Sequence, residues 1–156
     1  MNLGSIYTGF EGRIGRLQFW VATILVIAII LAILFASLWI VGESDLTVIR
    51  LNRLIITLVF LYPLLAVWVK RLHDRGRPGY MVIVFLVPWL LHQTTNLLGI
   101  TGEPLLLTSI DLLFILIDIV IGIWFVVDLG ILRGTKGTNK YGPDPLAGGG
   151  SLGDVT

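Results

Sequence analysis

The chain consists mainly of four long apolar stretches that are separated by short polar segments. The corresponding helices are expected at about residues 17–41, 51–69, 80–98 and 105–132, and the first of these stretches contains no ionisable residue. A membrane-spanning helix needs about 20 mostly apolar residues. Backbone groups in hydrocarbon must also bond within their own segment, which favours helices over strands. The pattern therefore predicts an all-α membrane protein with four transmembrane helices.

The distribution of glycine and proline predicts one domain followed by a tail. We expect the four-helix domain to cover residues 1–146 and residues 147–156 to be flexible, because Gly148–Gly150 is a run of glycines. Pro63 and Pro88 fall inside the second and third predicted helices. Each proline removes a backbone donor, so we expect it to kink its helix.

The composition agrees with a membrane location and argues against several classes of protein and of metal site. Apolar residues make up 56% of the chain and charged residues 13%, against about 45–50% and about 25% in soluble domains. A soluble enzyme and a nucleic-acid-binding protein are therefore both unfavourable interpretations. The absence of cysteine removes disulfides and Cys-ligated metals. Because His73 and His92 are predicted to lie toward opposite membrane faces, we expect no metal site and no cofactor.

The positions of the cations predict the orientation of the helices. Cytoplasmic loops carry an excess of Lys and Arg. Nine cations fall on one side, against Arg50 and Arg53 on the other. The nine are Arg13, Arg16, Lys70, Arg71, Arg75, Arg77, Arg133, Lys136 and Lys140. We therefore expect both termini to lie in the cytoplasm.

Three carboxylates lie in the fourth apolar stretch, at Asp111, Asp118 and Asp128. Counted at about 1.5 Å per residue, Asp118 is the deepest, about 21 Å from the cytoplasmic end. A charge at that depth is costly unless it is neutralised, solvated or paired. One interpretation is a proton or ion relay. The other, which we favour, is that Asp118 is protonated or fastens two helices through a hydroxyl group of a neighbour. The hydroxyl candidates are Thr23, Ser37 and Thr57.

A second polar cluster, KRLHDRGRPG, follows the second apolar stretch at Lys70–Gly79. Arg71 is suited to pair with Asp74 or with an anionic lipid headgroup. His73 next to Asp74 also suggests an acid–base pair. We favour the structural interpretation, a cationic loop that contains an ion pair.

A third segment, GTKGTNKYGPDP at Gly134–Pro145, resembles a phosphate-binding loop only faintly. The required glycine and lysine spacing is absent, and no strand is expected before it. Asn139, Asp144 and the prolines are instead typical of a compact turn.

Three segments together resemble the motifs of one family: FEGRIGRLQFW at Phe10–Trp20, RLHDRGRPGY at Arg71–Tyr80, and the segment Gly134–Pro145. On these motifs the chain resembles the DUF805 family of bacterial inner-membrane proteins, of the YhaH-like kind. Tyr80 stands where that family usually has Trp, and Pro78 where Ser is common. The resemblance implies a location in the bacterial inner membrane and implies no activity, because the family has no assigned function.

All three motif segments fall on the side that the cations assign to the cytoplasm. We expect their polar residues to form one cytoplasmic cap beneath the helices. In this cap Arg13 or Arg16 is expected to pair with Asp74, and Asn139 and Asp144 to fold the tail across the loop. The predicted cap residues are Arg13, Arg16, Arg71, His73, Asp74, Asn139, Tyr141 and Asp144.

These observations favour a non-enzymatic accessory or assembly subunit. Its cap would bind anionic lipid headgroups, a larger membrane protein complex or a second copy of the chain. The alternative is a small transporter or channel component that uses Asp118 within the membrane. A third interpretation, an enzyme that acts on lipids through His73 and Asp74, is less favoured. No nucleic-acid partner is expected.

Overall fold

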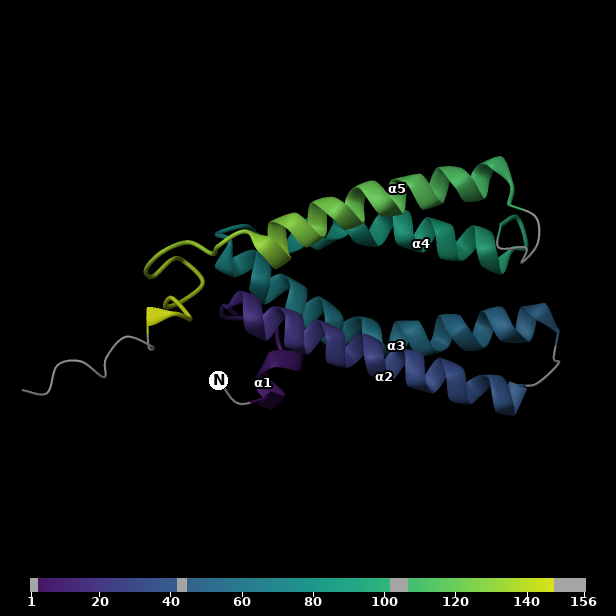
Figure 1. Cartoon of the computed structure of the whole chain (residues 1–156), viewed down its shortest axis with the longest axis horizontal. Coiled ribbons are helices and arrows are strands. Elements are labelled where there is room, and N and C mark those ends of the chain that lie inside the picture. Colours follow the sequence, from purple (N-terminus) through teal and green to yellow (C-terminus); the bar gives the residue numbers. More distant parts are fainter. Residues whose placement is uncertain (1–2, 42–44, 102–106, 148–156) are drawn as a thin grey trace, which may run out of the picture.

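The computed structural model describes residues 3–41, 45–101 and 107–147 (Figure 1). Within these ranges its regular elements are helices, and the only β pairing is an isolated bridge between Asn139 and Gly142. Four segments are long and apolar enough to cross a membrane, which confirms the predicted fold class at that level. The elements are α1 (Leu3–Tyr7), α2 (Arg16–Val41), α3 (Leu46–Asp74), the 3-10 turn η1 (Gly79–Val82), α4 (Ile83–Leu97), α5 (Ser109–Phe125) and the π-helix η2 (Val126–Ile131).

The second helix is longer than predicted at both ends. It begins at Leu46 because the Asp45 side chain accepts a hydrogen bond of 2.7 Å from the Thr47 amide and caps the first turn. It continues to Asp74, so Lys70, Arg71 and Asp74, which were expected in a loop, are helical, whereas Arg75 and Arg77 lie in the turn that follows. The sequence boundary was placed at residue 69 because charges disfavour hydrocarbon. The structure instead buries Lys70, Arg71 and Asp74 with polar partners.

The remaining boundaries differ less. The fourth predicted helix starts at Ser109 rather than 105, because Thr108 and Asp111 form a capping box. Pro63 and Pro88 lie inside α3 and α4, as predicted. The sequence interpretation did not include the short helix α1. Residues 42–44, 102–106 and 148–156, which include almost all of the expected flexible tail, lie outside the described residues.

The long helices form two antiparallel hairpins, α2–α3 and α4–α5 (Figure 1). Residues 3–15 and 133–147 both lie at the end where α2 begins and α3 ends. We call this the cap end, and we call the opposite end, where α3 and α5 begin, the far end. The hairpins contact each other through α3 with α4 and through η2 with α2 and α3.

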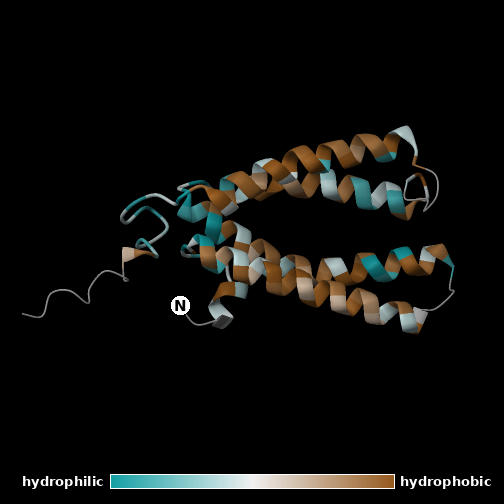
Figure 2. Ribbon diagram, in the orientation of Figure 1, coloured by the Kyte–Doolittle hydropathy of each residue, from teal (hydrophilic) through white to brown (hydrophobic). Residues whose placement is uncertain are grey.

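The buried apolar core lies mainly toward the cap end. The Trp68 ring of α3 makes edge-on contacts with Phe85 and Phe125, at centroid distances of 5.0 and 4.7 Å. On α3, the buried apolar residues all lie in its second half, from Leu64 to Leu72. Most other apolar side chains are exposed along the helices, as expected for surfaces that face lipid (Figure 2).

Candidate functional site

Asp74, at the last turn of α3, is the centre of the cap. Its Oδ1 accepts hydrogen bonds from Arg13 Nε and Nη2, at 3.1 and 2.9 Å, and its Oδ2 accepts one from Arg71 Nη1. All three side chains are at most 5% exposed. One buried carboxylate is therefore shared by two buried guanidinium groups, an arrangement in which the loss of either partner is costly.

Arg13 joins the two terminal segments of the chain to α3. Its Nη1 donates to the carbonyls of Gly137 and Gly142, at 2.7 and 3.1 Å. Its Nη2 also donates to the Thr135 carbonyl at 2.6 Å. Of the two arginines considered for the pair with Asp74, the structure uses Arg13. Arg16 instead donates to the Ile131 carbonyl at 3.1 Å.

Arg71 joins α3 to the end of the second hairpin. Its Nε donates to the Leu129 carbonyl and its Nη2 to the Leu132 carbonyl, both at 2.6 Å. These carbonyls belong to η2 and to the residue after it, where regular helical bonding ends. Trp20 Nε1 of α2 donates to the Gly130 carbonyl at 3.2 Å in the same region. Side chains of α2 and α3 therefore satisfy the freed backbone acceptors and hold both hairpins together.

Gly134 is required by a close approach of the backbone to this cluster. A Cβ atom built at Gly134 would lie 2.0 Å from Asp74 Oδ2. The next residue is Thr135, whose backbone amide and side-chain hydroxyl both donate to the Asp74 carbonyl, at 2.8 and 3.1 Å. The C-terminal segment therefore packs directly against Asp74 only because residue 134 has no side chain.

Lys70 holds α1 against α3. Its Nζ donates to the carbonyls of Ile6 and Thr8, both at 3.0 Å, and to that of Ser5. The residue is 1% exposed. The cation thus satisfies carbonyls at the C-terminal end of α1, where helix ends leave acceptors free.

The predicted tail residues also fold onto the cap. The Tyr141 ring stacks on His73 at a centroid distance of 3.8 Å, and Asn139 Nδ2 donates to the His73 carbonyl at 3.0 Å. Asp144 does not reach the loop but accepts from the amides of Gly137 and Leu146, at 3.1 and 3.0 Å. The Leu146 amide, followed by that of Gly137, lowers the pKa of the Asp144 carboxyl. Asp144 therefore shapes the tail itself, and Asn139 attaches it.

Asp128, which the sequence interpretation grouped with the intramembrane carboxylates, pairs with two arginines at the cap end. Its Oδ1 pairs with Arg75 Nη2 at 3.4 Å and with Arg77 Nη2 at 3.1 Å. Asp128 lies in η2, and the residue is 3% exposed. Both arginines come from the turn after α3, so this second shared carboxylate connects the two hairpins again.

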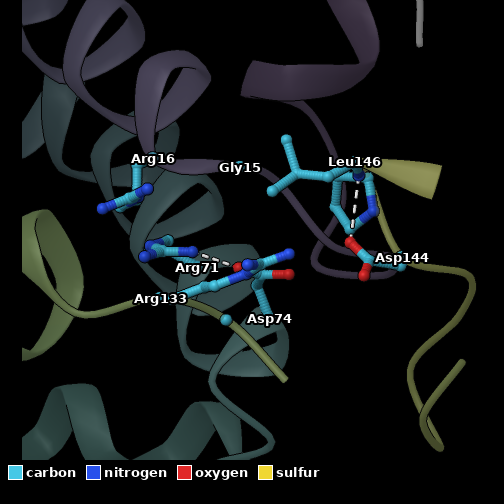
Figure 3. Close-up of a pocket in the computed structure, with 9 residues that line it drawn as sticks. Gly15, Arg16, Arg71, Asp74, Arg133, Asp144 and Leu146 are labelled. Carbon is cyan, nitrogen blue, oxygen red and sulfur yellow. Dashed lines mark hydrogen bonds and ion pairs between the residues drawn. The ribbon is translucent and has the colours of Figure 1, made fainter. Parts of the chain in front are cut away.

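The cap carries more positive than negative charge. Asp74 and Asp128 each offset two guanidinium groups, which leaves one positive charge in excess in each cluster. Arg16 and Arg133 line one small pocket beside Asp74 and Asp144 (Figure 3), and neither forms an ion pair within the described residues. A groove of about 400 Å³ adjoins it between Arg16, Leu17 and Leu146.

The two remaining predicted carboxylates lie away from the cap. Asp111 is buried at the start of α5, where its Oδ2 accepts from the Thr108 amide at 2.8 Å. Asp118 Oδ2 lies 3.1 Å from His92 Nδ1 of α4. The expected partners of Asp118 were hydroxyl groups, and the structure replaces them with this imidazole.

The sequence reasoning missed several groups of the site. Lys70 was counted only as a cation of the cytoplasmic side, and Thr135 and Gly134 were not singled out. Their positions in the sequence could have indicated a role in the site. Lys70 directly precedes the Arg71–Asp74 pair, and Gly134 and Thr135 are the first two residues of the third motif. His92 could have been found because it lies five residues before the end of α4 and Asp118 lies nine after the start of α5. In an antiparallel hairpin these positions have similar depths.

Comparison with known proteins places the chain among membrane proteins. The family model described as "Protein of unknown function (DUF805)" matches residues 7–143. The chain is 34% identical over 137 residues to the uncharacterized protein YiiR of Escherichia coli, covering 86% of this chain and 84% of that protein. It is 32% identical over 142 residues to the inner membrane protein YhaI, covering 91% and 90%. It is 28% identical over 144 residues to the inner membrane protein YhaH of the same organism, covering 89% and 88%.

No solved structure matches the chain. The three motif segments that carried the resemblance, at residues 10–20, 71–80 and 134–145, are the ones that meet around Asp74. With four helices able to span a membrane and relatives named as inner membrane proteins, the chain is a membrane protein. It belongs to the DUF805 family, whose function is unknown.

Proposed function

We propose that the protein is a non-enzymatic accessory protein of the bacterial inner membrane whose cap binds the phosphate groups of anionic lipids. In this proposal the cap faces the cytoplasm, as the distribution of Lys and Arg favours. The observation that carries the proposal is the position of Arg16 and Arg133. Both line one small pocket at the cap end beside Asp74 and Asp144, and neither forms an ion pair in the part of the chain that the structure describes, although Arg133 is close enough to help lower the pKa of the Asp144 carboxyl.

The depth of these two arginines supports a lipid ligand. Arg16 is the first residue of one candidate membrane span, and Arg133 lies two residues after the end of another at Ile131. Both guanidinium groups are therefore expected at the level of the lipid headgroups. Arginine binds phosphate through parallel hydrogen bonds, and anionic lipids attract cations at this surface.

The surroundings of the pocket also suit a lipid. Leu17 and Leu146 border the adjoining groove and are 77% and 57% exposed. A phosphate held by Arg16 and Arg133 would place the glycerol and acyl chains of the same lipid against these apolar side chains. The excess positive charge of the two carboxylate clusters adds to the attraction without requiring either cluster to open.

The groups that suggested catalysis are engaged elsewhere. His73 stacks on Tyr141, and its Nδ1 lies 3.3 Å from the Gly12 carbonyl, whereas Asp74 binds two arginines. This arrangement favours a structural role for both residues over an acid–base pair.

The proposal is tested by measuring lipid retention in native mass spectrometry from nanodiscs that contain phosphatidylglycerol and phosphatidylcholine with matched acyl chains. We expect the wild type to retain phosphatidylglycerol preferentially, and the double variant R16Q/R133Q to retain it at least tenfold less. A charge-assisted hydrogen bond contributes about 1.5–3 kcal/mol, and 1.4 kcal/mol corresponds to a factor of ten. The control K136Q/K140Q removes the same charge outside the pocket.

Two results would contradict this assignment. One is equal retention of phosphatidylglycerol by R16Q/R133Q and by K136Q/K140Q. The other is a stoichiometric protein partner that survives removal of all lipid and is lost in R16Q/R133Q, which would make the surface a protein interface.

Transport through Asp118 is the second candidate, and one observation favours it, the contact with His92 inside the membrane. If the protein carries ions, D118N abolishes ion-driven flux in proteoliposomes while R16Q/R133Q leaves it intact. Intact flux in D118N would remove this candidate.

A further inference from the structure

An ionisable pair lies between the two helices of the second hairpin, within two of the candidate membrane spans. His92 Nδ1 of α4 and Asp118 Oδ2 of α5 are 3.1 Å apart, within hydrogen-bonding distance. The His92 ring also stacks on Phe114 of α5, with a centroid distance of 4.9 Å and an interplanar angle of 4°. The stack fixes the plane of the imidazole and keeps Nδ1 directed at the carboxylate.

The pair is deep in the span and nearer to the far end. At about 1.5 Å per residue, Asp118 lies about 13 Å from the start of α5 and about 20 Å from Ile131. His92 lies about 8 Å from the end of α4. The two side chains are 23% and 35% exposed, so they are not sealed by protein. Water at the far end is therefore the nearer source of protons.

The protonation state of the pair determines its net charge in hydrocarbon. A neutral imidazole beside an ionised Asp118 carries a net charge of −1. One added proton, held by Nδ1 or by Oδ2, makes the pair neutral overall, either as imidazolium with carboxylate or as imidazole with carboxylic acid. An uncompensated charge is disfavoured in the bilayer, and the pair that holds this proton carries none.

The neighbouring charged groups act in opposite directions. On α3, Arg53 Nη2 donates to Asn96 Oδ1 at 2.6 Å, and Asn96 lies one turn from His92 on α4. This cation favours loss of the proton. On α5, Asp111 lies two turns before Asp118 on the same helix face and favours its retention, although hydrogen bonds from Thr108 hold its carboxylate. Arg50, three residues before Arg53, lies farther toward the far end.

We propose that His92 and Asp118 form a proton-binding site within the membrane, which takes up one proton per chain from the water at the far end. The hydrogen bond between Arg53 of α3 and Asn96 of α4 joins these two helices between the His92–Asp118 pair and the far end. Figure 2 shows these polar stretches of α3 and α4 in the half of the molecule away from the cap. The site is independent of the lipid pocket, so either proposal can fail alone.

The test uses the full-length protein in nanodiscs with ¹⁵N-labelled histidine, followed by nuclear magnetic resonance across a pH series. H92Q assigns the two imidazoles, and His73 at the cap end is an internal reference. We expect the pH response of the His92 signals to change strongly in D118N and only slightly in D111N, because Asp111 lies two turns away and its carboxylate is held by Thr108. The His73 signals should be the same in all variants.

An infrared measurement makes the test independent of how well D118N folds. Difference spectra between low and high pH should contain a carboxylic acid band in the wild type, and this band should shift in H92Q while persisting in D111N. The proposal is overturned if the His92 response is the same in the wild type and D118N. It is also overturned if neither the imidazole signals nor the carboxylic acid band change in the wild type over the pH series.

Discussion

The two ends of the helices are held together in different ways. At the cap end, buried charged residues share several partners each: Arg13 and Arg71 both bind Asp74 and also reach backbone carbonyls of distant segments. Toward the far end, the buried polar residues are neutral or locally bonded, as with the Thr95–Thr101 hydroxyl pair and the capping box of Asp111. The core apolar residues of α3 are also found only in its second half.

This difference indicates how a small membrane protein fixes its shape. Lipid is as apolar as a leucine side chain, so no hydrophobic force drives its helices together within the bilayer. Directional polar bonds must then specify the arrangement, and here they are concentrated where the three motif segments meet. We therefore expect variants at the cap end to cost more stability than variants at the far end.

The largest effect is expected from D74N. This change removes the carboxylate charge from two buried guanidinium groups, and breaking a buried pair in this way costs about 3–5 kcal/mol. Thermal unfolding in detergent should show a large decrease in Tm. D144N is the control, because Asp144 is a half-buried carboxylate of the same cap that forms no ion pair within the described residues, and an equal Tm for both variants would contradict the central role of Asp74.

A smaller loss is expected from G134A. The added Cβ would meet Asp74 Oδ2 at 2.0 Å, and the two arginines prevent Asp74 from moving away. Overpacking of this kind costs about 1–3 kcal/mol. G122A on α5 adds the same methyl group where nothing lies within 4 Å, so it should be neutral or stabilising. If G134A were as stable as G122A or more stable, the backbone at residue 134 would not pack closely against Asp74 in the folded protein.

The far-end pair of His92 and Asp118 should contribute less than the cap. Double-mutant cycles within membranes give about 0.6 kcal/mol per interhelical hydrogen bond, with a maximum near 1.7 kcal/mol. A cycle of H92Q, D118N and the double variant, measured by unfolding in mixed micelles, should give a coupling in that range. A coupling as large as the cost of D74N would mean that the two ends do not differ.

The smallest effect is expected from two carboxylates that accept only local hydrogen bonds, Asp45 at the far end and Asp144 at the cap end. Their response to acid should be the same at both ends. The Thr47 amide and hydroxyl lower the pKa of Asp45 at the far end, as the Leu146 and Gly137 amides do for Asp144 at the cap. Because the folded-state pKa is depressed, each carboxylate stabilises its turn above its ordinary pKa and loses this effect as the pH falls through the lower folded value. Protection factors of the first α3 turn should therefore drop in strong acid, but not in D45N, since Asn caps without titrating. If the protection factors of the first α3 turn still drop in strong acid in D45N, another titrating group causes the drop.

Much of the fold was predictable because it follows from hydropathy alone. The uninterrupted apolar run of α2 leaves few alternatives to a spanning helix, whereas the capping box that starts α5 at Ser109 was not part of the prediction. The meeting of the motif segments, and a pair between an early arginine and Asp74, followed from the placement of cations on one side. The choice of Arg13 over Arg16 did not follow, because it depends on which side chain points toward the end of α3.

The unpredicted parts depend on backbone geometry that the sequence does not show directly. Asp128 lies in the π-helix η2, where its side chain pairs with Arg75 and Arg77. The partners of Arg71 and Lys70 are mostly backbone carbonyls, which every residue carries, so no residue type marks them. His92 was assigned to a membrane face rather than compared in depth with Asp118 across the hairpin.

The central claim is that Asp74 and its two arginines hold the hairpins together at the cap end, and distance measurements between spin labels test it most directly. The chain has no cysteine, so exposed positions can be labelled without removing native residues. Labels at V21C and V127C report on the cap end, and labels at L38C and L112C report on the far end. We predict a narrower distance distribution for the cap pair than for the far pair in nanodiscs, and a clear broadening of the cap pair in D74N. Unchanged distributions for both pairs in D74N would contradict the claim.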